Sequence, residues 1–117
     1  QTHSLIWDVS DLDDPQLVTE YKADNASSDH NLYIKDGIMY QSNYMSGLQV
    51  LDVNNPADPV KIGYFDTEPF GEDEPGFAGT WSNYPFFDSD IVIMTSSDEG
   101  LFILDPQNAK AKATGTR

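Results

Sequence analysis

The sequence predicts an all-β protein, a β-propeller segment with one complete four-stranded antiparallel blade and two partial blades. Three observations lead to this fold class. Apolar residues alternate or form blocks of strand length, and turn-forming residues separate these blocks. Aspartate, a turn former, outnumbers glutamate, a helix former, by 15 to 5. The chain also repeats itself at the spacing of a propeller blade.

Nine short strands are expected in chain order. Each is rich in apolar residues and is bounded by Asp, Asn, Gly or Pro, which favour turns. The predicted strands are Ser4–Val9, Gln16–Tyr21, Asn31–Lys35, Ile38–Ser42, Leu48–Val53, Val60–Phe65, Trp81–Phe87, Ile91–Thr95 and Leu101–Leu104. No convincing amphipathic helix is found, because apolar residues do not recur at a spacing of three to four.

The internal repeat defines the architecture. A shift of 44 residues aligns six pairs without a gap: Asp8 with Asp52, Val9 with Val53, Asp14 with Asp58, Pro15 with Pro59, Val18 with Ile62 and Tyr21 with Phe65. Residues 47–52 match residues 100–105 at a shift of 53, and the extra residues fall in an acidic insertion. A period of about 40–45 residues with four short strands is typical of a propeller blade.

The repeat divides residues 1–105 into parts of three blades. Residues 4–21 are expected to be the outer edge of one blade, 31–65 a full blade and 81–104 the inner three strands of the next. The acidic insertion spans 66–79, and residues 106–117 form a polar, basic tail that we expect to be disordered or a linker. A ring needs about four to eight blades, so we expect further blades of a longer chain, or other copies, to complete it.

Composition argues against several classes of function. The 117 residues contain 6 Lys and Arg and 20 Asp and Glu, for a formal net charge of −14, and no cysteine. This charge repels nucleic-acid phosphates and anionic lipid headgroups. Without cysteine there is no disulfide framework, thiolate nucleophile or cysteine-ligated metal. No apolar run approaches the roughly 20 residues that span a bilayer, so we expect no nucleic-acid partner and no membrane insertion.

Several sequence motifs follow one another along the chain, at residues 29–34, 40–44, 46–53, 56–60, 63–67, 81–86 and 100–104. In type and in order they resemble the motifs of LVIVD-repeat proteins, most closely those of the bacterial choice-of-anchor B family. The resemblance covers about Leu5 to Leu104. It implies a secreted or surface-anchored propeller, extracellular in location, with this segment near the C-terminal end of the repeat region. It brings no settled enzymatic activity and no catalytic residues.

The acidic insertion has two interpretations. Carboxylates supply the hard oxygen ligands that Ca²⁺ prefers, and the candidate ligands are Asp66, Glu68, Glu72, Asp73 and Glu74. Their spacing does not match an EF-hand loop, so we favour a solvated or partner-binding loop. In the partner-binding case, Phe70 and Phe77 are apolar anchors, and the surrounding acids favour a basic partner.

A second group of polar residues recurs at the repeat spacing. Asp8, Asp11, Asp13 and Asp14 correspond to Asp52, Asn54, Asn55 and Asp58. Asp and Asn side chains accept hydrogen bonds from nearby backbone N–H groups. We therefore expect these residues to shape turns rather than to bind metal.

Polar and aromatic residues are expected at the rim of the propeller channel. The candidates are Asp29, His30 and Asn31 before the innermost strand of the full blade, and Trp81, Asn83 and Tyr84 on that of the next. The two sets are expected to face each other. His30 is either a metal ligand or proton carrier, or, as we favour, a structural residue whose tautomer Asp29 fixes.

Two classes of function follow. The first is a non-enzymatic cell-surface module that contacts a protein, a glycan or an ion. The second is a metal-assisted hydrolase or lactonase-like enzyme with its site at the channel mouth, an analogy drawn only from the fold. The sequence has no G-x-S-x-G elbow, glycine-rich phosphate loop or H-E-x-x-H pair. We therefore assign no catalytic residues and favour the interaction module.

Overall fold

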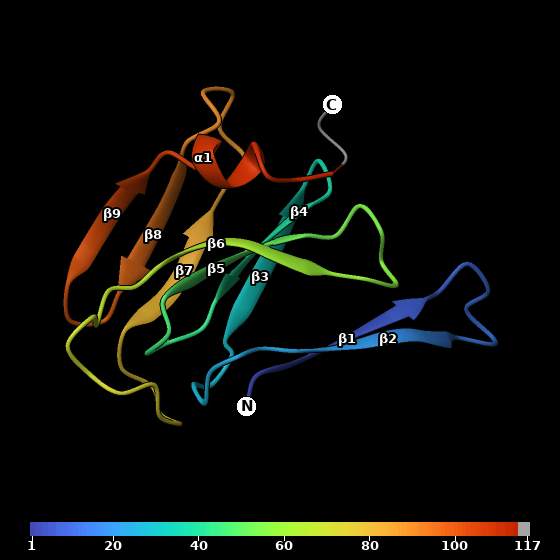
Figure 1. Cartoon of the computed structure of the whole chain (residues 1–117), viewed down its shortest axis with the longest axis horizontal. Helices are drawn as coiled ribbons and strands as arrows, with labels where there is room; N and C mark the ends of the chain where they lie inside the picture. Colours follow the sequence, from blue (N-terminus) through green and yellow to red (C-terminus); the bar gives the residue numbers. More distant parts are fainter. Residues whose placement is uncertain (115–117) are drawn as a thin grey trace.

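The computed structural model describes residues 1–114, which form three antiparallel β-sheets in chain order. A hairpin contains β1 (His3–Asp8) and β2 (Gln16–Lys22). The middle sheet contains β3 (Asn31–Lys35), β4 (Ile38–Ser42), β5 (Leu48–Asp52) and β6 (Val60–Phe65), and the third sheet contains β7 (Thr80–Tyr84), β8 (Val92–Ser96) and β9 (Gly100–Leu104). Figure 1 shows the third sheet on one side of the middle sheet and the hairpin projecting from the other.

All nine predicted strands are confirmed, and three of them have the predicted bounds. The largest difference is at β7, predicted to reach Phe87 but ending at Tyr84. Pro85 follows Tyr84 and has no backbone N–H to donate to a neighbouring strand. The predicted full sheet over 31–65 is also confirmed, because its strands pair in the order β3-β4-β5-β6.

The sequence repeat is also a repeat of backbone geometry. In the hairpin the register shifts between Ile6 and Trp7, and Val18 is left without a partner on β1. In the middle sheet the register shifts between Val50 and Leu51, and Ile62 is the unpaired residue. The two bulges stand at corresponding positions of the 44-residue repeat, so the two strand pairs are built on one plan.

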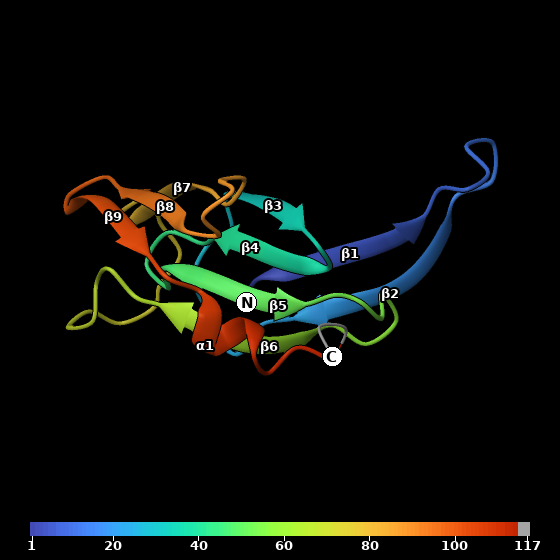
Figure 2. The same cartoon turned by 90° about the horizontal axis from the view of Figure 1, so that it is seen from above.

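The middle sheet is covered on both faces, and every residue of β4 and β5 is buried. One face packs against the third sheet in a cluster of Ile38, Tyr40, Leu48, Val50, Ile62, Val92, Met94 and Ala113. The opposite face meets the hairpin, where the Gln41 side-chain amide donates to Ser4 Oγ at 2.7 Å. Figure 2 shows the third sheet and the hairpin tip at opposite ends of the molecule.

The two end sheets leave apolar side chains in solvent. Trp7 on the hairpin is 48% exposed, although its repeat equivalent Leu51 in the middle sheet is fully buried. Ile103 on β9 is 67% exposed, although its equivalent Val50 is buried. Equivalent positions therefore differ in burial only because the middle sheet has a neighbour on each face and the end sheets do not.

The tail corrects one prediction. Instead of the disordered or linker segment expected for residues 106–117, residues Gln107–Lys110 form a short helix, α1, that contacts β6. Ala113 belongs to the buried core, and the backbone N–H and hydroxyl of Thr114 donate to Asp52 Oδ2 at 2.6 and 2.8 Å. Small alanine side chains make the apolar contact, so the tail shows no apolar periodicity in the sequence. The last part of the predicted tail, residues 115–117, lies outside the described residues.

Two equivalent turn glycines provide a matched test of this geometry. Gly47 and Gly100 have φ of 74° and 87°, in the left-handed region that side chains disfavour. A Cβ on Gly47 would lie 2.1 Å from the Phe65 carbonyl oxygen, whereas a Cβ on Gly100 meets nothing within 4 Å. In urea unfolding we expect Gly100→Ala to cost about 1 kcal/mol and Gly47→Ala at least about 2 kcal/mol. Equal losses would contradict the close packing of the Gly47 turn.

Candidate functional site

The start of β3 and the start of β7 lie side by side, which brings together two groups of residues singled out in the sequence. His30 Nδ1 hydrogen-bonds the Trp81 carbonyl oxygen, and the two rings are 4.5 Å apart. Asn31 Nδ2 donates to Ser82 Oγ at 3.1 Å. Since a carbonyl oxygen only accepts, His30 carries its proton on Nδ1 when neutral. The Trp81 carbonyl therefore fixes the tautomer, a role we had expected Asp29 to play.

Two further aromatic residues complete this arrangement. The Tyr44 ring lies 5.1 Å from His30, 5.9 Å from Trp81 and 5.4 Å from Phe77. We call His30, Tyr44, Phe77 and Trp81 the aromatic cluster. Tyr44 is buried at its centre, and its backbone pairs with Thr80 in a bridge that joins the middle and third sheets. Sequence reasoning missed Tyr44, although an aromatic residue in a glycine-containing turn was a usable signal.

A bulge in β7 directs Trp81 toward the cluster. Thr80 pairs with Ser96 and Ser82 with Thr95, so Trp81 is the unpaired residue between them. Such bulges re-aim a side chain and disturb the alternation of faces along a strand. Trp81 is consequently 49% exposed, while Thr80 beside it is fully buried.

The other two rim candidates lie elsewhere. Asn83 is buried, and its amide donates to the Tyr40 carbonyl at 3.1 Å and to Ser42 Oγ at 2.7 Å. Tyr84 packs edge-to-face with Phe86 and Phe87. Asn83 is therefore a polar joint between two sheets, and Tyr84 belongs to a separate aromatic group.

The acidic insertion is tied to the body of the protein at both ends. At its start, Thr67 is buried and its hydroxyl lies 3.2 Å from that of Thr80. Near its end, the Gly76 N–H donates to Ser28 Oγ at 3.3 Å. Between these points Phe70 is fully exposed. Phe77, just after the second point, is 77% exposed and contacts Tyr44. Of the two predicted partner anchors, Phe77 therefore belongs to the aromatic cluster.

The carboxylates proposed as calcium ligands do not gather into one site among the described residues. Asp66 accepts the Glu68 backbone N–H at 2.7 Å, which shapes a turn. Burial, followed by the charges of Glu99, Asp98 and Asp66, raises the pKa of Glu68. Burial likewise raises the pKa of Asp73. Within residues 1–114, no three His, Cys, Asp or Glu side chains gather so as to hold a metal ion.

The turn role predicted for the repeated Asp and Asn residues is confirmed for Asp8, Asp11, Asp52 and Asn55. Asp8, Asp52 and Asp105, each at the end of a strand, accept the backbone N–H of the residue two positions later. Asp11 and Asn55 do the same within the following turns. Asp52 differs in being buried and in accepting from Thr114 as well, and these hydrogen bonds hold its pKa far below the ordinary range.

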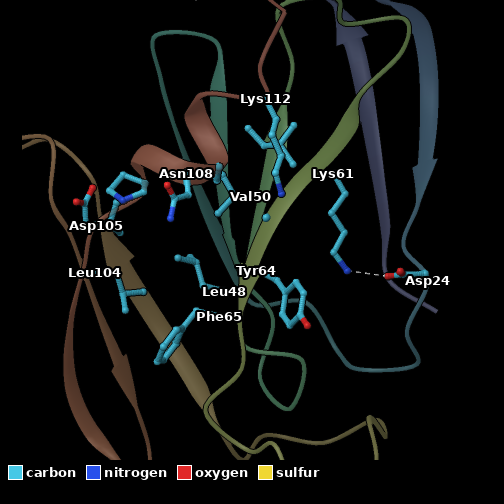
Figure 3. Close-up of a pocket in the computed structure, with 15 residues that line it drawn as sticks. Asp24, Leu48, Val50, Lys61, Tyr64, Phe65, Leu104, Asp105, Asn108 and Lys112 are labelled. Carbon is cyan, nitrogen blue, oxygen red and sulfur yellow. Dashed lines mark hydrogen bonds and ion pairs between the residues drawn. The ribbon is translucent and has the colours of Figure 1, made fainter.

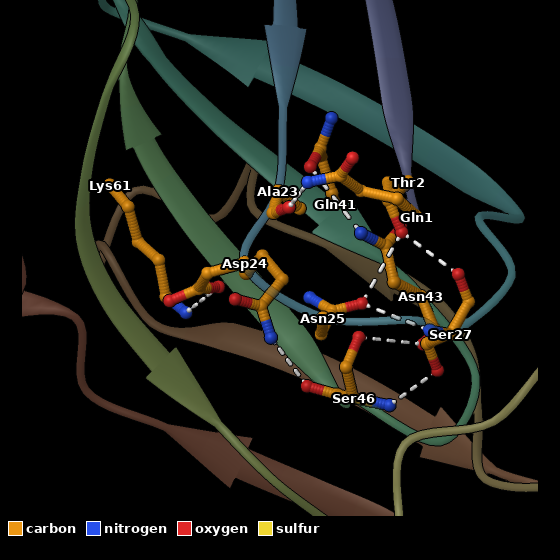
Figure 4. Close-up of polar contacts among 11 residues, drawn as sticks. Gln1, Thr2, Ala23, Asp24, Asn25, Ser27, Gln41, Asn43, Ser46 and Lys61 are labelled. Atoms are coloured by element: carbon orange, nitrogen blue, oxygen red, sulfur yellow. Dashed lines mark hydrogen bonds and ion pairs between the residues drawn. The ribbon is translucent and has the colours of Figure 1, made fainter.

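Figure 4 shows a polar network that positions the chain between β2 and β3. Thr2 Oγ1 donates to the Ser27 carbonyl at 2.9 Å, and Asn25 Oδ1 accepts the Ser27 N–H at 3.1 Å. The Ser46 N–H donates to Ser27 Oγ at 2.9 Å. The network holds this segment against the turn that carries Tyr44, and so fixes both Ser28 and His30.

Two hollows accompany these features. The larger, of about 720 Å³, lies between β6, β9 and α1 and is shown in Figure 3. Its floor belongs to the core and includes Leu48, Val50 and Val92, and Lys61 at its side pairs with Asp24 at 3.0 Å. The smaller, of about 280 Å³, lies beside the cluster and is lined by His3, Ser4, Leu5, Asp29, His30, Asn31, Leu32, Gln41 and Asn43.

No protein-family model, curated protein or solved structure matches this chain. In residues 1–114, no helix has the length and apolar character to cross a membrane. The structure itself defines the class as an all-β protein of antiparallel sheets that follow one another along the chain. The candidate site is the aromatic cluster beside the acidic insertion.

Proposed function

We propose that the chain is part of a secreted or cell-surface β-propeller of the LVIVD-repeat type. Its role is that of a non-enzymatic interaction module for a protein, a glycan or an ion. The observation that carries the proposal is the repeated packing of sheet on sheet, which leaves one face of each end sheet open, and the two open faces are opposite faces of the repeat. The motifs in residues 5–104 that resemble choice-of-anchor B proteins support the extracellular location.

The open faces are those that further blades would cover. The Trp7 face of the hairpin corresponds to the Leu51 face, which the preceding sheet covers in the middle sheet. The Ile103 face of β9 corresponds to the Val50 face, which the following sheet covers. The hairpin has two strands where the middle sheet has four, so a complete blade would add two inner strands to it. These strands would cover Leu32 and Ile34 on β3, which are about half exposed. The three sheets thus provide two different, complementary ends, as consecutive blades of one ring require.

The proposal predicts that the isolated chain associates through its open faces. Burying an Ile or Trp side chain contributes roughly 1.5–3 kcal/mol, so placing a charge there should weaken association at least about tenfold. We expect this loss for Trp7→Asp and for Ile103→Asp in sedimentation velocity. Leu12→Asp is the control, because Leu12 is exposed in the hairpin turn away from both sheet faces. A strictly monomeric wild-type chain with a cooperative thermal transition would contradict the proposal.

A further inference from the structure

We infer that the aromatic cluster and the acidic insertion beside it bind an arginine-rich segment of a partner protein. This inference rests on the proposed role as an interaction module and names its partner class. Two features of one surface carry it: exposed aromatic rings held at fixed angles, and a run of carboxylates without a neighbouring cation in the sequence.

The rings offer accessible faces for a flat cation. Trp81 is about half exposed and Phe77 about three-quarters exposed. His30 is also exposed, and it lines the smaller hollow. The His30 and Trp81 planes meet at 44°, and the Tyr44 and Phe77 planes at 71°. The cluster is therefore a corrugated surface rather than a closed stack. A guanidinium within about 6 Å of an aromatic face gains cation–π attraction, and its planar shape also allows stacking.

The charge around the rings selects a cation over a neutral ligand. Glu72, Asp73 and Glu74 come three to five residues before Phe77 in the insertion, and residues 66–79 contain no Lys or Arg. Asp29 is exposed next to His30. A basic segment is steered toward this surface, and arginine can pair with a carboxylate through two parallel N–H groups. A glycan would gain from the rings but nothing from the net charge.

The surface is formed before any ligand binds. The Tyr44–Thr80 bridge, the Thr67–Thr80 contact and the Gly76–Ser28 hydrogen bond hold the rings and the insertion in place. Binding then requires little ordering of the protein, which reduces the entropic cost of association.

Fluorescence anisotropy of the full chain with labelled peptides tests the inference. The probe is a Gly-Arg repeat of three arginines, compared with the same peptide in which lysine or neutral citrulline replaces each arginine. We expect binding in the order arginine, lysine, citrulline, with the citrulline peptide at least about tenfold weaker and the arginine affinity falling as salt rises. Equal binding of the arginine and citrulline peptides, or an affinity independent of salt, would overturn the inference.

Variants locate the site. Trp81→Ala and Phe77→Ala should each weaken arginine-peptide binding at least about threefold, consistent with the loss of one cation–π contact. Phe86→Ala is the matched control, because Phe86 is a 43% exposed aromatic residue in the separate group with Tyr84, and it should change binding less than twofold.

Neutralising the insertion with Glu72→Gln, Asp73→Asn and Glu74→Gln together should weaken binding and flatten its salt dependence. Unchanged binding in that variant, or in both aromatic variants, would refute the site, as would binding that EDTA abolishes, which would indicate a calcium-dependent site instead.

The two proposals fail separately. If the chain associates through Trp7 and Ile103 but does not bind the arginine peptide, the proposed function stands and this inference is refuted. A chain that binds the peptide through Trp81 but remains a compact, cooperative monomer retains the site and refutes the propeller segment.

Discussion

Asn83→Asp is expected to destabilise the protein by about 3–5 kcal/mol, the cost of an uncompensated buried charge. Asn83 is buried and donates from its amide to the Tyr40 carbonyl and to Ser42 Oγ. Its own Oδ1 has no hydrogen-bond partner. A carboxylate of the same shape would place a negative charge against the Tyr40 carbonyl oxygen and remove both amide donor contacts.

Urea unfolding at pH 7 and at pH 4.5 measures this effect. Burial raises the pKa of the new carboxyl above its unfolded value, so the destabilisation should shrink as pH falls and the group is protonated. Asn108→Asp, at an exposed position on α1, is the control and should change stability by less than about 0.5 kcal/mol. A loss of under 1 kcal/mol for Asn83→Asp would show that the side chain does not join the two sheets.

Asp52→Ala is expected to cost about 3 kcal/mol, because it removes a buried carboxylate that gathers hydrogen bonds from two segments. Its Oδ1 accepts from the backbone and side chain of Asn54, and its Oδ2 accepts from the backbone and hydroxyl of Thr114. The substitution releases the tail from the end of β5. Asp105→Ala is the matched control at the equivalent repeat position, where the side chain accepts from Gln107 and is exposed.

The contribution of Asp52 should depend on pH in a defined direction. Its pKa in the folded protein lies below the unfolded value of about 3.9, so its stabilisation is present above that value. It is lost as pH falls from about 4 toward the folded pKa. The difference in unfolding free energy between wild type and Asp52→Ala should therefore narrow between pH 5 and pH 2. A constant difference would show that the hydrogen bonds do not depend on the carboxylate charge.

The sequence by itself determined the local structure of this protein. Nine strands were predicted because alternating apolar residues and Asp, Asn, Gly and Pro turns act over a few neighbouring residues. The turn roles of Asp8 and Asp52 followed from the same short-range chemistry, since each accepts an N–H two residues away. The 44-residue repeat gave information over a longer range and predicted the full sheet over 31–65. In that sheet the β5–β6 pair has the same bulge as the β1–β2 hairpin.

Only the tertiary structure decided which distant residues share a site. The sequence placed His30 and Phe77 in unrelated features, and nothing local indicated that Tyr44 would lie between them. The Trp81 bulge and the Tyr44–Thr80 bridge create that neighbourhood, and both depend on pairing between segments far apart in the chain. The tail was misjudged for the same reason. Ala109, Ala113 and Thr114 carry little apolar surface and form no apolar pattern, and their partners, the core and Asp52, lie far away in the sequence.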